Sequence, residues 1–291
     1  MSTRLETVRD YQERMNKVLA YIQKHLDAPL SLKATAEVAC FSPFHFHRWF
    51  AAIVGEPLSR HVRRLRLERA ALQLCQSDLA VTDIALAAGY ETPSAFNKAF
   101  KQQFRCAPSV FKKRKQNVFI TTRDAIRITP HKEPRMEPKI VERPEKTVVY
   151  VRRTGPYAKA AGEAWGAVCK FAYSRRLVNK AEGSEFIGIS YDDPNVTAGD
   201  KLRYEACITV KPGVKGEGEV GVKQLEGGKF AMFLHKGPYE GFVKTYEEIF
   251  GRWLPASGAK LRDLPSFELY LNSPGRTKPE NRRTEIYIPI R

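Results

Sequence analysis

The sequence predicts two domains of different fold class: an all-α domain with two helix-turn-helix units in tandem, then an α+β domain made of two β-α-β-β repeats. Two internal duplications, one in each half of the 291 residues, carry this prediction. The length fits roughly two domains, and a hydrophobic content of 43% is enough to give each a core. We expect the first domain at residues 1–116, a proline-containing linker at 117–136 and the second domain at 137–291.

The duplication in the first half relates residues about fifty positions apart. The matched positions are a cap residue before proline and two phenylalanines: Ser42, Phe46 and Phe50 against Thr92, Phe96 and Phe100. In each unit a short helix, around 32–39 or 81–88, precedes a tight turn and a second helix. Ser42 or Thr92 is expected to cap this second helix, because proline follows at its first position. The pattern is that of a helix-turn-helix, occurring twice.

The segment between the two units, residues 58–74, is expected to be a rigid connecting helix. It contains neither glycine nor proline and is rich in strong helix formers. Its arginines either contact phosphates or form a solvated basic face, and the sequence leaves both open. They are Arg60, Arg63, Arg64, Arg66 and Arg69.

The second helix of the first unit lies in FSPFHFHRWF, residues 41–50, and has two faces. Phe46, Trp49 and Phe50 share a stripe that is expected to be core. In a helix-turn-helix the opposite face enters the major groove and presents side chains to base edges. We therefore expect DNA contacts from this face, from the first cap and from the corresponding face of the second unit. These residues are Ser42, Phe44, His47, Arg48, Ser94, Asn97 and Lys98.

The histidines and cysteines do not form a metal-binding pattern. His45 and His47 point about 200° apart on a helix and cannot easily share one ion, so His45 is assigned a phosphate contact or no role. The five cysteines are scattered without a CxxC pair, which argues against a zinc ribbon and a disulfide framework. We expect no metal and no cofactor.

Charge and hydropathy set the expected partners and location. Lys and Arg number 49 against 32 Asp and Glu, and a net charge of +17 favours polyanions such as nucleic acid or acidic lipid. The N-terminus has no apolar segment of the signal-peptide type, and no run of eighteen apolar residues occurs. We expect a cytoplasmic protein with no membrane partner.

The second duplication has a spacing of about eighty residues. KTVVYVRRTGPY at 146–157 is echoed by GKFAMFLHKGPY at 228–239, and two later strand segments in each half also correspond. The order is strand, Gly-Pro-Tyr turn, amphipathic helix, strand and strand, performed twice. Such units predict one mostly antiparallel sheet with two helices on one face. The Gly-Pro-Tyr motifs are interpreted as architecture, since glycine permits the turn and proline begins the helix.

The last strand, TEIYIPI, alternates between two faces. Ile286, Ile288 and Ile290 are expected to pack on the helices, with Glu285 and Tyr287 on the other face. The offset of eighty residues assigns Glu205 and Cys207 to that second face, and we place Ser190 and Tyr270 there as well. It is unusually aromatic for a solvent surface, although an exposed strand glutamate is the alternative for Glu285. The expected ligand contacts are Glu285, Tyr287, Tyr270, Glu205 and, from a helix, Trp165, which is equally typical of core.

The first half resembles the DNA-binding domain of AraC/XylS transcriptional regulators over roughly residues 10–115. The resemblance rests on SPFHFHRWF, VRRLRLERA, VTDIALAAGYETPSAFNKAFKQQF and APSVFKKR. It implies a single chain that places two recognition helices in successive major grooves about 34 Å apart. Arg105 stands where the family often has glycine, so a different turn is expected after the second recognition helix.

The second half is similar to GyrI-like effector-binding domains, on the basis of IVERPEKTVVYVRRTGPY and the duplicated β-α-β-β pattern over about 137–291. The order of the two domains is that of Rob-type regulators. In this family a carboxylate from the last strand lies in an aromatic pocket and pairs with lipophilic cations. The resemblance gives that position to Glu285.

These features predict a DNA-binding transcriptional regulator whose second domain senses a small, lipophilic cationic effector. One alternative is a regulator whose second domain docks a protein partner such as RNA polymerase. Another is a small-molecule hydrolase of GyrI-like type, because a Glu and a Tyr in one pocket could carry out acid-base chemistry. No Ser-His-Asp or Cys-His pattern supports the hydrolase, so we expect no enzyme activity.

Overall fold

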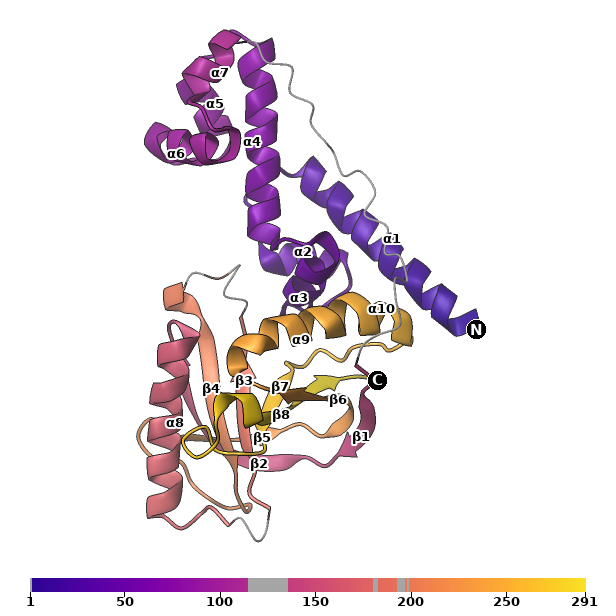
Figure 1. Ribbon diagram of the computed structural model, residues 1–291, viewed down its shortest axis with the longest axis vertical. Coiled ribbons are helices and arrows are strands. Elements are labelled where there is room, and N and C mark those ends of the chain that lie inside the picture. The colour runs from indigo at the N-terminus through magenta and orange to yellow at the C-terminus, as the bar shows by residue number, and fades with distance from the viewer. Residues whose placement is uncertain (1, 115–135, 180–182, 193–196, 198) are drawn as a thin grey trace.

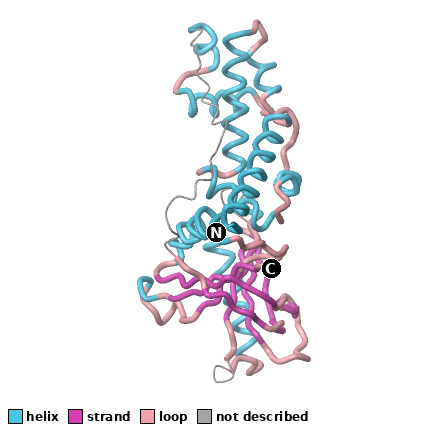
Figure 2. The backbone as a smooth tube through the Cα atoms, turned by 90° about the vertical axis from the view of Figure 1, so that its right-hand side faces the viewer, coloured by secondary structure: helices cyan, strands magenta, loops and turns pink. Residues whose placement is uncertain are grey.

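The computed structural model describes residues 2–114, 136–179, 183–192, 197 and 199–291, so the predicted linker lies almost entirely outside the described residues. The N-terminal helices lie towards one end of the long axis of the molecule, and the sheet with its own helices lies at the other (Figures 1 and 2). No helix of the described residues combines the length and the apolar character needed to cross a membrane.

The first helix-turn-helix unit is formed by α2 (Leu32–Val38) and α3 (Pro43–Val54), preceded by the long helix α1 (Ser2–Lys24). The Ser31 hydroxyl caps α2 by accepting a hydrogen bond from the Ala34 amide at 3.1 Å. Ser42 stands at the N-cap of α3, but its side chain makes no cap hydrogen bond. Pro43 opens α3 as predicted.

The second unit lies at the far end of the connecting helix α4 (Leu58–Gln76) (Figure 1). It consists of α5 (Val81–Ala87) and α6 (Pro93–Phe104), followed by α7 (Pro108–Arg114). The Thr92 hydroxyl caps α6 through the Ala95 amide at 3.2 Å. The prediction of two helix-turn-helix units joined by a helix is therefore confirmed.

Both units place left-handed residues at the same two turn positions. Cys40 (φ 53°) and Gly89 (φ 79°) correspond in the turn between the helices, and Gly55 (φ 80°) and Arg105 (φ 60°) correspond after the second helix. Each unit thus has glycine at one of the two left-handed turn positions and a residue with a Cβ atom at the other. The expectation of a different turn at Arg105 is wrong, because the arginine adopts the conformation that glycine has in the first unit.

The described residues of the C-terminal domain form one antiparallel sheet of eight strands, in the order β1-β6-β8-β7-β3-β4-β2-β5. The first four strands and their helix are β1 (Lys139–Arg143), β2 (Lys146–Thr154), α8 (Tyr157–Ser174), β3 (Phe186–Ser190), the short helix η1 (Gly199–Lys201) and β4 (Arg203–Thr209). The second set is β5 (Gly221–Leu225), β6 (Gly228–Lys236), η2 (Tyr239–Gly241), α9 (Phe242–Glu248), the π-helical turn η3 (Ile249–Trp253), α10 (Leu254–Ser257), β7 (Phe267–Tyr270), η4 (Pro279–Asn281) and β8 (Arg283–Pro289). The two predicted β-α-β-β repeats are present.

The strand order is symmetric about the seam between β3 and β7. Each repeat also has an additional first strand, which the sequence analysis missed. These strands pair across the repeats: β1 pairs with β6 of the second repeat, and β5 pairs with β2 of the first. The two halves of the sheet are therefore interlocked at both edges as well as joined at the seam.

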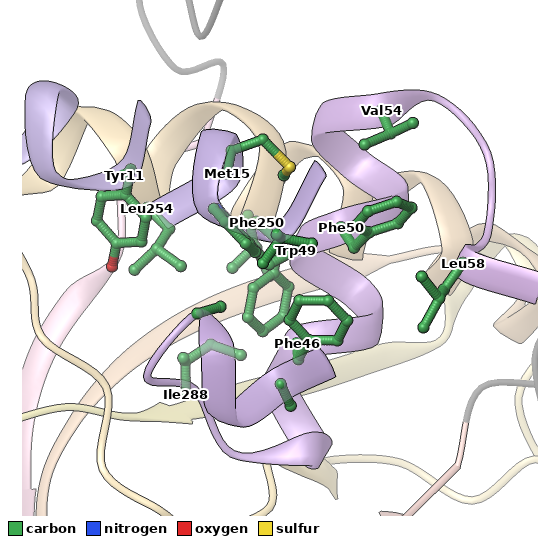
Figure 3. Packing of buried hydrophobic residues seen from close by; sticks show 14 of the residues in the cluster. Tyr11, Met15, Phe46, Trp49, Phe50, Val54, Leu58, Phe250, Leu254 and Ile288 are labelled. Carbon is green, nitrogen blue, oxygen red and sulfur yellow. The ribbon is translucent and has the colours of Figure 1, made fainter. Parts of the chain in front are cut away.

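The first unit shares a hydrophobic core with the C-terminal domain (Figure 3). Phe46, Trp49 and Phe50 of α3 are fully buried in one cluster with Phe250 of η3 and Ile288 of β8. The second unit has a separate cluster of its own, built from α4–α7. The first unit is consequently docked on the sheet domain, whereas the second stands away from it (Figure 1).

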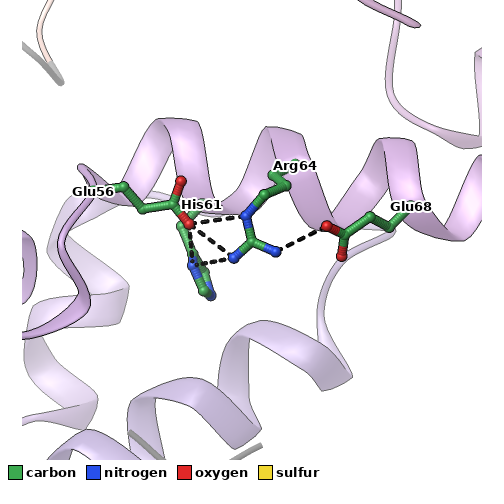
Figure 4. Close-up of polar contacts among 4 residues, drawn as sticks. All are labelled: Glu56, His61, Arg64 and Glu68. Carbon is green, nitrogen blue, oxygen red and sulfur yellow. Dashed lines mark hydrogen bonds and ion pairs between the residues drawn. The ribbon is translucent and has the colours of Figure 1, made fainter. Parts of the chain in front are cut away.

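A polar cluster fixes the corner between α3 and α4 (Figure 4). One carboxylate oxygen of Glu56 accepts hydrogen bonds from His61 at 2.9 Å and from Arg64 at 2.8 and 3.0 Å, and Arg64 also donates to Glu68 at 2.9 Å. The His61 ring packs edge-on against Phe50, 5.5 Å away. These contacts tie α4 to the recognition helix of the first unit.

Candidate functional site

A cavity of about 1090 Å³ lies between α3, α8, α9 and the central strands, next to the seam of the two repeats. Its wall is dominated by aromatic side chains, which include Trp165, Tyr204, Tyr239, Tyr246, Tyr270, Phe186 and Phe242. Cavities of this size and lining are typical of small-molecule sites. Trp165 and Tyr270, both expected as ligand contacts, lie in this wall.

Hydrogen bonds and edge contacts hold the aromatic wall in place. The Trp165 indole N–H donates to the Tyr204 hydroxyl at 2.9 Å, and the Tyr204 and Tyr270 hydroxyls are 3.2 Å apart. The Tyr270 ring meets the edges of Trp165 at 5.6 Å and Tyr239 at 5.4 Å between centroids. Such rigid rings offer a large apolar surface without loss of side-chain entropy on binding.

Gly188 in β3 makes room for two of these rings. A Cβ atom at this position would lie 2.5 Å from the Tyr204 hydroxyl and 2.8 Å from the Tyr270 hydroxyl. Gly188 pairs with Glu268 on one side and Ala206 on the other, so it lies in the part of the sheet that faces the cavity.

Glu268 of β7 is the buried carboxylate of the cavity, with an exposed fraction of 2%. Its Oε1 accepts a hydrogen bond from the Tyr246 hydroxyl at 2.6 Å, while Oε2 has no hydrogen-bond partner among the described residues. Burial raises the pKa of Glu268 to about 6, although Arg48 and Tyr246 act in the opposite direction. A buried carboxylate with one free oxygen favours a ligand that brings a positive charge or a hydrogen-bond donor.

Arg48 of α3 projects into the same cavity. Its guanidinium lies over the Tyr246 ring, 3.8 Å from the centroid. It donates hydrogen bonds to the Ser266 hydroxyl at 2.6 Å and to the Ser190 carbonyl at 3.4 Å. Arg48 and Glu268 therefore contact opposite parts of the same tyrosine, the ring face and the hydroxyl.

Two other predicted DNA contacts of the first unit, His47 and Phe44, also lie against the C-terminal domain, whereas the buried Ser42 hydroxyl has no hydrogen-bond partner among the described residues. His47 is buried and lines the cavity, and its Nδ1 donates to the Pro43 carbonyl at 2.9 Å. Phe44 meets the Tyr191 ring edge-on at 6.0 Å. In this docked arrangement the face expected to contact DNA lies against α9 and the end of β3 and borders the cavity.

His45 occupies a structural position. Its exposed fraction is 1%, and its Nε2 donates to the Arg262 carbonyl at 3.2 Å. Burial, with a smaller contribution from Arg48, lowers the pKa of His45 to about 3, so the ring is neutral at physiological pH. The suggested phosphate contact is incompatible with this buried position. Within the described ranges, no group of three or more His, Cys, Asp or Glu side chains could hold a metal ion.

The corresponding face of the second unit is free. Ser94, Asn97 and Lys98 are all exposed on α6, and the buried residues Phe96, Ala99 and Phe100 lie on its other side. The two equivalent recognition faces therefore differ in environment, one covered by the C-terminal domain and one open to solvent.

Three of the five expected ligand contacts lie outside the cavity. Ile286, Ile288 and Ile290 pack towards the helices as predicted, and Glu285 and Tyr287 are bonded to each other at 2.7 Å on the opposite face. Glu205, fully buried on that opposite face, accepts hydrogen bonds from side chains that hold its pKa down against burial: Lys223, Tyr191 and Arg152.

The placement of Ser190 and Tyr270 on the face of Glu285 is wrong. Tyr270 pairs directly with Thr284, and Glu268 pairs with Ile286, so β7 presents residues 268 and 270 to the helix side. Ser190 likewise pairs with Tyr204 on the helix side. The eighty-residue offset shows which residues of the two repeats are equivalent. It does not show which face of the sheet these residues occupy, because that is set by the register in which the strands pair.

Four cavity residues were not predicted from the sequence: Glu268, Tyr246 and the two tyrosines of the Gly-Pro-Tyr motifs. Glycine and proline of these motifs have the architectural role expected, but Tyr157 and Tyr239 both line the cavity. The sequence feature that could have indicated a role in the cavity is that both tyrosines occur at equivalent positions of the two repeats. For Glu268 the indication was a charged residue within FELY, a short strand otherwise composed of apolar and aromatic residues.

Comparison with known proteins places this chain in a defined family. The model of the GyrI-like small molecule binding domain matches residues 136–291, more than half of the chain. The chain belongs to the GyrI-like family. In this GyrI-like protein, residues 35–114 match a helix-turn-helix domain model, which together with the C-terminal match gives the architecture of an AraC-type transcriptional regulator with a GyrI-like domain.

Relatives of this GyrI-like protein include transcriptional regulators with one or both domains. The transcriptional regulator Rob of Salmonella typhimurium is 25% identical over 94% of this chain and 96% of its own length. The regulatory protein SoxS of Escherichia coli is 29% identical over 36% of this chain and 97% of its own. A cryo-EM structure of an EcmrR-DNA complex in EcmrR-RPo covers 80% of this chain and 81% of that chain, with 16% identity and a TM-score of 0.47.

Proposed function

We propose that this protein is a sequence-specific DNA-binding regulator whose C-terminal domain, residues 137–291, senses a lipophilic cation in the cavity beside Glu268. The single observation that carries the sensing proposal is the free Oε2 of a carboxylate that is 98% buried among aromatic rings, since its exposed fraction is 2%. A cation satisfies this oxygen and gains cation-π attraction of about 0.5–2 kcal/mol from the rings around it. In a protein with a net charge of +17, the Glu268 carboxylate supplies the local attraction for a cation, which has to compete with Arg48 in the same cavity.

The DNA-binding proposal rests on the 1–116 domain and, in the docked arrangement, on α6. Its exposed face offers a hydroxyl, an amide and an ammonium group from Ser94, Asn97 and Lys98. These groups match the donors and acceptors of base edges in the major groove. The net positive charge favours approach to a polyanion. A chain of this kind would use α3 in a second groove only when its recognition face is uncovered.

Two alternatives for the C-terminal domain are less well supported. Docking of a protein partner such as RNA polymerase does not require a cavity of about 1090 Å³ with a buried carboxylate. Hydrolysis would require an activated nucleophile or water, whereas one oxygen of Glu268 is already bonded to Tyr246. The relatives described above are regulators, which argues against the hydrolase.

Calorimetric titration with a matched ligand pair tests the sensing proposal. Naphthalene-2-carboxamidine is cationic, and naphthalene-2-carboxamide has nearly the same shape without the charge. We expect the wild-type protein to prefer the amidine and Glu268→Gln to lose that preference. Glu285→Gln is the control, because Glu285 lies on the opposite face of the sheet. Equal binding of the two compounds by the wild-type protein would exclude a charge-selective cavity.

Gel-shift measurements with a duplex selected from a random library test the DNA proposal. Lys98→Ala is expected to cost about 1–3 kcal/mol on the preferred sequence and to relax base preference. Lys244→Ala removes the same charge from an exposed position on α9 and is expected to leave specificity unchanged. An equal loss on every sequence would make Lys98 a phosphate contact.

A further inference from the structure

Arg48 and Lys98 occupy equivalent positions in the two recognition helices but have opposite surroundings. Lys98 is exposed on α6, where it is available to DNA. Arg48 is turned into the cavity of the C-terminal domain, where it stacks on Tyr246. Arg48 is the side chain of the first unit best suited to donate hydrogen bonds to guanine, but it makes its contacts within the protein.

The cavity holds the Arg48 guanidinium as it would hold a ligand. One ring face, one hydroxyl and one carbonyl contact the cation, through Tyr246, Ser266 and Ser190. Ser266 is itself buried, with an exposed fraction of 3%, so its hydroxyl is positioned for this donor. The negative potential of Glu268 adds to the attraction, and the Arg48 charge in turn lowers the pKa of Glu268 below the value that burial alone would give.

We propose that Arg48 is the internal cation of this cavity, and that a planar effector cation carrying N–H donors displaces it. Loss of the Arg48 contacts weakens the docking of α3, which its buried core residues otherwise maintain, and so shifts α3 towards DNA. This inference rests on the proposed function and specifies both the class of effector and the direction of its effect. Two planar cations cannot stack on the same face of Tyr246, so the effector and Arg48 exclude each other there. Because the cavity already holds the guanidinium group of Arg48, amidines and guanidines are the class of cation whose geometry fits the same contacts.

Effector binding and DNA binding are thermodynamically linked, because both require the undocked state of α3. An effector that binds only the undocked state shifts the population towards it, by no more than its difference in affinity for the two states. DNA that engages α3 also requires the undocked state. Effector and DNA therefore raise each other's affinity by the same factor. Without effector, the protein contacts DNA through α6 alone.

The first experiment measures whether Arg48 competes with the effector. Naphthalene-2-carboxamidine is titrated into the full-length wild-type protein, Arg48→Ala and Lys98→Ala. We expect Arg48→Ala to bind the amidine about tenfold more tightly, a coupling of ordinary size. Lys98→Ala is the matched control with the same loss of charge at the equivalent position, and its affinity should equal that of the wild type. Unchanged or weaker binding by Arg48→Ala overturns the inference.

The second experiment measures release of α3 on DNA. Hydroxyl-radical footprinting is done on a duplex selected in the presence of the amidine, with the wild-type protein and Glu268→Gln. We expect the amidine to extend wild-type protection from one major groove to two, about one helical turn apart, and to raise affinity about tenfold. Glu268→Gln should show neither change, which also controls for direct binding of the amidine to DNA. Full two-groove protection without amidine overturns the inference.

The outcomes separate the inference from the proposed function. If the wild-type protein prefers the amidine over the amide but Arg48→Ala does not gain affinity, the sensing proposal stands and the internal-cation proposal fails. If the wild-type protein shows no preference for the amidine, the sensing proposal fails, and this inference fails with it.

Discussion

Arg105 follows α6 with the same left-handed backbone that Gly55 has after α3, at φ 60° and 80° respectively. A residue with a Cβ atom in this conformation is strained by about 1 kcal/mol or more, and glycine is not. Arg105→Gly is therefore expected to stabilise the second unit by about 1 kcal/mol in urea unfolding followed by circular dichroism. The reverse change in the first unit, Gly55→Ala, should destabilise through strain alone, because a Cβ at position 55 meets no atom within 4 Å. A loss of stability in Arg105→Gly would contradict this interpretation.

Glu268 is expected to lower stability at neutral pH. Its pKa of about 6 in the folded protein exceeds the ordinary value of 4.5, so the folded state binds the proton more tightly than the unfolded state. The stability linked to this proton is fully present below about pH 4.5 and is lost as pH rises through about 6. Glu268→Gln should therefore raise the free energy of unfolding by about 2 kcal/mol at pH 7.5 and have little effect at pH 4.5. A pH-independent effect of the substitution would rule out this origin.

A reversible cross-link tests whether DNA binding by α3 needs separation of the docked surfaces. A Cβ atom at Gly251 in η3 would lie 3.2 Å from the Ala52 Cβ atom of α3, close to the spacing found in disulfides. The double variant Ala52→Cys/Gly251→Cys should therefore form a disulfide when oxidised. With the amidine present throughout, we expect the oxidised form to protect only the groove bound by α6, and reduction to restore the second groove. The single variants, treated identically, control for the five native cysteines. Two-groove protection by the oxidised double variant would show that docking and DNA contact are compatible.

Gly188→Ala is expected to block the cavity without disturbing the DNA-binding helices. The new methyl group would overlap the hydroxyls of Tyr204 and Tyr270, which are held by bonds to each other and to Trp165. Moving these buried rings costs about 1–3 kcal/mol and narrows the aromatic wall. Titration with the amidine should show a loss of affinity, while the gel shift through α6 remains as in the wild type. Gly166→Ala on α8 is a control, because its Cβ atom would meet nothing within 4 Å.

The elements of the fold were predictable because their causes are local. Caps such as Thr92 and the prolines after them mark helix starts, and the two duplications repeat these marks. The alternation in β8 likewise placed Ile286, Ile288 and Ile290 on the helix side. Each of these inferences needed only neighbours in the sequence.

The cavity was harder to predict because its composition depends on contacts between distant segments. The face occupied by Tyr270 follows from its pairing with Thr284, and no feature of either strand alone specifies that register. The position of Arg48 follows from docking of α3 on a domain that begins almost ninety residues later. A helical wheel correctly separated its polar face from its core face, but it carried no information about what covers the polar face.

The exchange of first strands between the repeats makes the sheet one unit. Since β1 completes the second repeat and β5 completes the first, neither half has a full complement of strands from its own sequence. This is the strand exchange of a domain-swapped homodimer, here within one polypeptide. Neither half is therefore expected to fold when it is expressed alone. The two halves differ at the seam, where Glu268 of one pairs with Gly188 at the equivalent position of the other.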